Sequence, residues 1–105
     1  MVIEIKDILH PDLELFSKIK DRTLIGDNFF IIESKKVFLK AIDADIKVKT
    51  VLLSKNLQDE ILPLLDESIK VLVVSDDILN AVVKFKSHTK VFALAEIPEE
   101  KIDYD

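Results

Sequence analysis

Apolar residues in this chain occur mainly as short continuous runs, and most runs are followed by a segment in which apolar positions recur with helical spacing. The runs are rich in β-branched and aromatic residues, which is typical of strands that are buried on both faces. They predict strands at residues 29–33, 47–54, 69–74 and 91–97. Strands that alternate with helices at short spacing predict an α/β domain, a three-layer α/β/α sandwich with a mixed, largely parallel four-stranded sheet.

The helical segments are predicted from their spacing and from their end signals. The first covers residues 10–22, the second covers residues 35–44, and a fourth follows Ser75. Asn56 is expected to cap a third helix, which Pro63 must kink or split. Residues 2–5 fit either a short edge strand or an ordered arm. The second helix is expected to bury one stripe of residues, namely Val37, Phe38, Ala41 and Ile42.

The junction between the first strong strand and its helix has an unusual charge pattern. Ser34 occupies the N-cap position, Lys35 and Lys36 follow in the first turn, and Asp43 and Asp45 lie at the far end. A helix N-terminus carries about half a positive charge and favours acids, so this arrangement is reversed. Free N–H groups, a hydroxyl and two ammonium groups together fit a phosphate. The alternative is that both lysines are simply solvated.

Length and composition restrict the domain organisation. The 105 residues are 49% hydrophobic, which is enough for one globular domain. We assign residues 1–97 to this domain and the acidic residues 98–105 to a tail or linker. No apolar run has the length of a membrane span, no signal peptide is recognisable and the chain has no cysteine, so a cytoplasmic location is expected.

Few residues in the chain are suited to catalysis or to binding a nucleotide. Gly26 is the only glycine, whereas phosphate-binding loops and dinucleotide fingerprints require several. Two histidines and no cysteine give little material for a metal centre or a catalytic triad. The acidic pair Asp76 and Asp77 fits helix capping better than a phospho-receiver site. We therefore expect no catalytic residues, no metal site and no cofactor in this chain.

Basic residues gather in two segments although the net charge is −5. Residues 34–55 contain six lysines and two aspartates, and residues 84–90 contain three lysines, one histidine and no acid. If these two segments meet in space, the domain has a basic face, which would suit a polyanion better than the net charge suggests.

The order of the motifs resembles the N-terminal substrate-binding domain of the SpoU (TrmH) family of RNA ribose 2′-O-methyltransferases, over almost the whole chain. The first helix, HPDLELFSKIKDR, is similar to the opening helix of that family, and a strand VLLS follows later. The family motif F-I-x-E-G-x-x-x-V is matched by Phe30, Ile31, Glu33 and Val37. The motif H-x-G-V-x-A-x-A is matched in part by His88, Val91, Ala93 and Ala95. The two family glycines are replaced by Ser34 and Lys90.

The resemblance implies a fold similar to kink-turn-binding ribosomal proteins and a role in recognising rRNA or tRNA. In the family, a separate domain binds S-adenosylmethionine and transfers the methyl group. The resemblance thus implies that this chain alone is not an enzyme and that its parent protein would be an S-adenosylmethionine-dependent RNA methyltransferase. Expected partners are structured RNA and a methyltransferase domain in cis, with no membrane and no DNA.

The predicted RNA-binding residues come from the two basic segments. They are Ser34, Lys35, Lys36, Lys40, Lys84, Lys86, Ser87, His88 and Lys90. Lysines would hold phosphates and helix N–H groups would add directional hydrogen bonds. Phe85 is the one candidate for stacking on a base, and the alternative is that it belongs to the core. The alternative is a protein-interaction or packing module derived from the same domain that does not bind RNA, for which an exposed apolar patch is expected.

Overall fold

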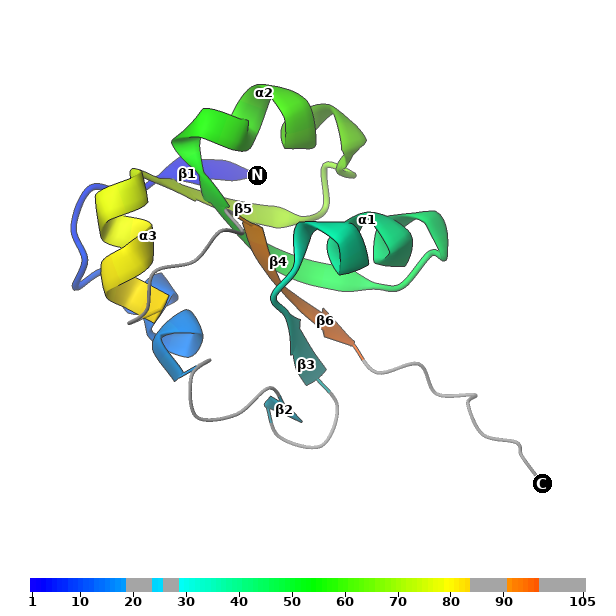
Figure 1. Cartoon of the computed structure of the whole chain (residues 1–105), viewed down its shortest axis with the longest axis horizontal. Coiled ribbons are helices and arrows are strands. Elements are labelled where there is room, and N and C mark those ends of the chain that lie inside the picture. Colours follow the sequence, from blue (N-terminus) through cyan, green and yellow to red (C-terminus); the bar gives the residue numbers. More distant parts are fainter. Residues whose placement is uncertain (19–23, 26–28, 84–90, 97–105) are drawn as a thin grey trace.

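The computed structural model of the chain describes residues 1–18, 24–25, 29–83 and 91–96. Within these residues, six strands form one mixed sheet in the order β1-β5-β4-β6-β3-β2 (Figure 1). Their bounds are Val2–Glu4 (β1), Leu24–Ile25 (β2), Phe29–Ile32 (β3), Val48–Ser54 (β4), Lys70–Val74 (β5) and Val91–Glu96 (β6). The predicted tail at residues 98–105 lies outside the described residues, and the domain boundary at residue 97 stays a prediction.

The sheet differs from the predicted one in strand number and in direction. Strand β5 pairs in parallel with both β1 and β4, whereas β4–β6, β6–β3 and β3–β2 are antiparallel pairs. The prediction of four largely parallel strands was therefore wrong. A continuous apolar run shows that a strand is buried but carries no information on its direction. The two additional strands, β1 and β2, are only three and two residues long, and β1 is the edge strand that residues 2–5 allowed.

Helical segments cover both faces of the sheet. On one face lie α1 and the short helices around α2, and on the other face lie α3 and η1 (Figure 1). Their bounds are Pro11–Lys18 (η1), Lys35–Asp43 (α1), Lys55–Leu57 (η2), Gln58–Ile61 (α2), Leu62–Leu64 (η3) and Asp76–Val83 (α3). The segments η1, η2 and η3 are 3-10 helices, so the first predicted helix is a 3-10 helix in its described part.

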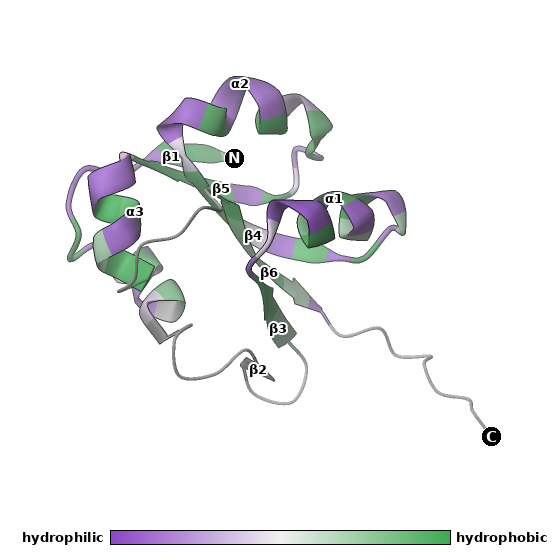
Figure 2. Ribbon diagram, viewed as in Figure 1, coloured by the Kyte–Doolittle hydropathy of each residue, from purple (hydrophilic) through white to green (hydrophobic). Residues whose placement is uncertain are grey.

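Two apolar clusters fill the spaces between these layers, one on each face of the sheet. Along β4, Val51 and Leu53 belong to the cluster beneath α1, and Leu52 belongs to the cluster beneath α3. Phe38 and Phe92 are fully buried in the first and second cluster respectively. Figure 2 shows the strands mainly in green, the colour of hydrophobic residues, whereas the helices alternate between green and purple. The described residues thus form the predicted three layers.

The ends of the helices test the capping predictions. The hydroxyl of Ser75 accepts a hydrogen bond from the N–H of Ile78 at the start of α3, as predicted. Pro63 follows the end of α2 and lies in a separate 3-10 turn, so the predicted split is confirmed. The prediction for Asn56 was wrong, because Ser54 is the N-cap of η2. Val37 was also misplaced, since it is 50% exposed and does not join the buried stripe of α1.

Candidate nucleic-acid interface

The predicted basic segments begin or end at one edge of the sheet. Because β6 is antiparallel to both β4 and β3, the latter two strands run in the same direction and end at this edge. Ile32 pairs with Ala93 and Leu53 pairs with Val91, so Ser34 follows the end of β3 where β6 begins. Ligands of open α/β sheets commonly bind outside the carboxyl ends of strands. We call this edge, with the start of α1, the β3/β4 edge.

The second basic segment lies outside the described residues. It connects Val83 at the end of α3 to Val91 at the start of β6, and Val91 lies at the β3/β4 edge. The predicted site residues Lys84, Lys86, Ser87, His88 and Lys90, and the candidate stacking residue Phe85, all belong to this segment. Their assignment to an RNA-binding site therefore stays a prediction. The structure places only Val91, the residue that follows them, at the β3/β4 edge.

Ser34 caps α1 as its sequence position predicted. Its backbone is extended, with φ −127° and ψ 135°, and its Oγ accepts a hydrogen bond from the N–H of Val37 at 3.3 Å. The carbonyl of Ser34 accepts the first helical hydrogen bond, from the N–H of Phe38, at 2.8 Å. Phe38 is fully buried beneath the helix, so packing and capping together fix where α1 begins.

The lysines of α1 differ in their surroundings. The Lys35 ammonium lies 2.5 Å from a carboxylate oxygen of Glu60 in α2, a contact that local sequence did not predict. Lys36 and Lys40 are exposed, and none of the described acids forms an ion pair with either of them. They are four residues apart on one helix face, where like charges repel by a few tenths of a kcal/mol. A polyanion on this face would remove that repulsion.

A buried polar cluster joins β4 to α3 at the same edge and was missed by the sequence analysis. The fully buried Ser54 hydroxyl donates a hydrogen bond to Asp76 Oδ1 at 2.5 Å and accepts one from the Asn56 N–H at 3.1 Å. The Asn56 side-chain amide donates to Asp76 Oδ2 at 3.1 Å. The only sequence signal was a serine at the end of a buried strand. The cluster holds the chain rigidly where β4 leaves the sheet.

Three other lysines of the described residues, Lys49, Lys55 and Lys70, form ion pairs with acids. The hydrogen bond from Lys55, at 2.8 Å, lowers the pKa of the Glu4 carboxyl, and the positive charge of Lys55 adds to this effect. The hydrogen bond from Lys70 likewise lowers the pKa of the Asp12 carboxyl, and the two groups are 2.8 Å apart. Both pairs are partly exposed, so they neutralise local charge more than they stabilise the fold. They leave Lys55 and Lys70 less available to a polyanion.

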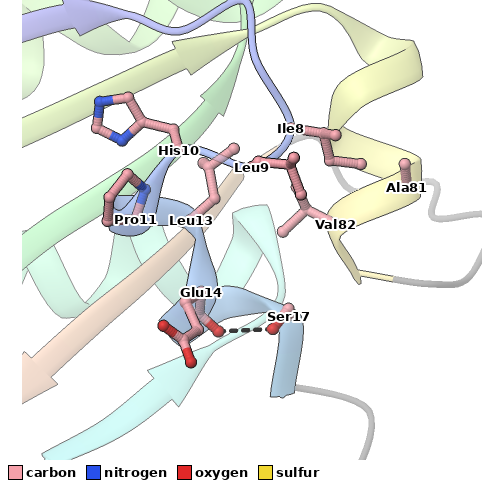
Figure 3. Close-up of a pocket in the computed structure, with 9 residues that line it drawn as sticks. All are labelled: Ile8, Leu9, His10, Pro11, Leu13, Glu14, Ser17, Ala81 and Val82. Atoms are coloured by element: carbon pink, nitrogen blue, oxygen red, sulfur yellow. Dashed lines mark hydrogen bonds between the residues drawn. The ribbon is translucent and has the colours of Figure 1, made fainter.

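An apolar groove lies on the face of the sheet that η1 and α3 cover, opposite the face that α1 covers (Figure 3). Its volume is about 340 Å³, within the ordinary range for ligand pockets. Leu9 at its rim is 83% exposed and Ile8 is 44% exposed. The groove is lined by Ile8, Leu9, His10, Pro11, Leu13, Glu14, Ser17, Ala81 and Val82. His10 Nδ1 accepts a hydrogen bond from the Asp12 N–H at 3.1 Å, which gives this histidine a structural role.

Known proteins resemble this chain in structure but not detectably in sequence. No family model matches the sequence, and no curated protein matches it. An rRNA methyltransferase from Sinorhizobium meliloti superposes with a TM-score of 0.66 and 17% identity, over 92% of this chain and 38% of that one. The chain shares its fold with part of an RNA methyltransferase.

Two further structures agree with this result. The AdoMet-bound form of the Sinorhizobium meliloti enzyme also gives a TM-score of 0.66 at 17% identity, over 92% of this chain and 37% of that one. An RNA 2′-O ribose methyltransferase gives 0.65 at 19% identity, over 98% of this chain and 41% of that one. The chain spans about two fifths of the length of these proteins. At sequence identities this low, the structural similarity shows a shared fold and nothing beyond it.

Within the described residues, no helix is long and apolar enough to span a membrane.

Proposed function

We propose that this chain is an RNA-binding domain that recognises the rRNA or tRNA substrate of a SpoU/TrmH-like RNA 2′-O-methyltransferase. The observation that carries the proposal is the exposure of two lysines on α1, the helix that begins at the β3/β4 edge. Lys36 in its first turn and Lys40 one turn further on face solvent without an acidic partner among the described residues. The proposal is supported by the fold, which this chain shares with a part of RNA methyltransferases that makes up about two fifths of their length.

Binding would depend on phosphates and on the shape of the RNA. The ammonium groups of Lys36 and Lys40 would hold phosphates as point charges, and the first N–H groups of α1 would donate hydrogen bonds. The predicted residues Lys84, Lys86, Ser87, His88 and Lys90 would add to this surface, because their segment leads into Val91 at the β3/β4 edge. Structured RNA is proposed in place of DNA because the similar structures are RNA methyltransferases, and double-stranded RNA is recognised mostly by its shape.

Catalysis would belong to a different domain. We assign to this chain no catalytic residue and no cofactor, and we place S-adenosylmethionine and methyl transfer in a methyltransferase domain of the parent protein. The chain would then act in the cytoplasm by presenting RNA to that domain, with no membrane partner.

Fluorescence anisotropy with a labelled hairpin RNA that carries an internal bulge tests the proposal. Lys36→Glu combined with Lys40→Glu should weaken binding at least about tenfold and reduce the salt dependence, because two phosphate contacts are lost. Lys35 is left unchanged because Glu60 already pairs with it. Lys47→Glu with Lys49→Glu changes the net charge equally and is the control. Lys47 precedes β4 and Lys49 is its second residue, 3.5 Å from the Glu96 carboxylate, so both lie at the opposite end of the strand from the β3/β4 edge. Equal effects of the two double variants would refute the proposed surface.

The apolar groove favours a second candidate, a protein-interaction module that does not bind RNA. Leu9, 83% exposed beside a groove of about 340 Å³, is the exposed apolar feature that such a module requires. NMR titration with a methyltransferase catalytic domain supplied in trans separates the two candidates. Shifts at Leu13 and Val82 that persist in high salt, with no response to RNA, would favour the interaction module.

A further inference from the structure

An acidic side chain of this chain pairs with Lys35, which lies on α1 beside the two lysines that we propose bind RNA phosphate. The Glu60 carboxylate is 2.5 Å from the Lys35 ammonium, and the two side chains are 51% and 39% exposed respectively. Glu60 belongs to α2, which covers the same face of the sheet as α1 (Figure 1). A carboxylate and a phosphate accept the same charge-assisted hydrogen bonds from an ammonium group.

We infer that Glu60 competes with RNA phosphate for Lys35 and thereby limits the affinity of the β3/β4 edge for RNA. The inference rests on the proposed RNA-binding function. Glu60 would act as an internal substitute for a phosphate, which an RNA must displace before it contacts Lys35. Single phosphates and flexible polyanions would gain little from that exchange, whereas an RNA also held by Lys36 and Lys40 would complete it.

The exposure of the pair favours competition over a positioning role. Ion pairs between exposed side chains contribute little to stability, because water and salt screen them and because two long side chains lose entropy. The contact is therefore too weak to hold Lys35 in a fixed orientation, yet close enough to occupy its ammonium group. Ser34 and the burial of Phe38 determine where α1 begins, so the helix does not depend on Glu60.

A matched pair of charge-removing variants tests the inference. Glu60→Gln and Asp59→Asn each remove one negative charge from exposed neighbouring positions of α2, so both share any general gain from a less negative domain. In anisotropy titrations with the bulged hairpin RNA, Glu60→Gln should bind tighter than Asp59→Asn, by up to about fivefold, the affinity equivalent of one surface ion pair. In a Lys35→Ala background, the two variants should bind equally.

Each other outcome overturns the inference. Equal affinities of Glu60→Gln and Asp59→Asn would show that the ion pair does not compete with RNA. Weaker binding by Glu60→Gln would show that Glu60 positions Lys35, and a gain that persists in the Lys35→Ala background would act through another group. If neither wild type nor Glu60→Gln binds RNA, the proposed function fails as well. If wild type binds RNA and the gain is absent, only the competition is refuted.

Discussion

Replacing Ser54 by alanine should destabilise the domain far more than its small volume suggests. The hydroxyl of this fully buried residue donates to the Asp76 carboxylate and accepts from the Asn56 N–H. Ser54→Ala removes both bonds and leaves a carboxylate oxygen and an N–H group without this partner. The free energy of unfolding should therefore be sensitive to the loss of this one hydroxyl.

The magnitude follows from the two bonds that are lost. A hydrogen bond to a charged group contributes about 1.5 to 3 kcal/mol, and a lost cap costs about 0.5 to 2 kcal/mol. Since one hydroxyl makes both contacts, the sum is an upper limit, and we expect a loss of about 2 to 4 kcal/mol in the free energy of unfolding. That is a large part of the roughly 5 to 15 kcal/mol that a domain of this size possesses.

Urea unfolding followed by circular dichroism measures this loss, and Ser75→Ala is the matched control. Ser75 is also a helix-capping serine, but it is exposed and its bond to the Ile78 N–H is 3.3 Å long. Its loss should cost about 1 kcal/mol or less. If Ser54→Ala loses no more stability than Ser75→Ala, with the same m-value, the argument from burial and the charged acceptor is refuted.

Three further outcomes are expected. Phe38→Ala should cost about 3 to 5 kcal/mol in urea unfolding, because the fully buried ring leaves a cavity beneath α1; a loss under 1 kcal/mol would contradict that packing. Folding lowers the pKa values of Glu4 and Asp12, so the unfolded chain binds more protons than the folded one at acidic pH. The free energy of unfolding should therefore fall as the pH drops from about 5 through the folded pKa values of these groups. Lys55→Gln with Lys70→Gln should make this pH dependence smaller. The two RNA-binding comparisons, of the α1 lysines and of Glu60, should give the affinity changes stated above.

Much of the fold was predictable because local signals determine it. Strands β3, β4, β5 and β6 coincide with apolar runs to within one or two residues, and Ser34 and Ser75 cap helices where their positions predicted. The order and direction of the strands were not predictable, since pairing depends on contacts between residues far apart in sequence. Strand β2 was missed because two residues are too few to carry a periodic pattern.

The candidate site was predictable to a lesser extent. The N-cap at Ser34 and the exposure of Lys36 and Lys40 follow from the sequence of α1 alone. The contact between Lys35 and Glu60 does not, because it depends on how α1 and α2 lie side by side on the sheet. Ser54 and not Asn56 caps the turn after β4, because η2 begins at Lys55 and Asn56 lies within it.

The position of β6 has a consequence for how the chain folds as it is synthesised. The last strand of the described chain lies between β4 and β3, and it joins β1, β5 and β4 to the hairpin of β3 and β2. Until residues 91–96 have left the ribosome, these two parts of the sheet have no strand between them. The facing sides of β4 and β3 therefore stay without a partner strand until β6 is inserted between them. The β3/β4 edge, with the lysines of α1, would be completed in the same late step.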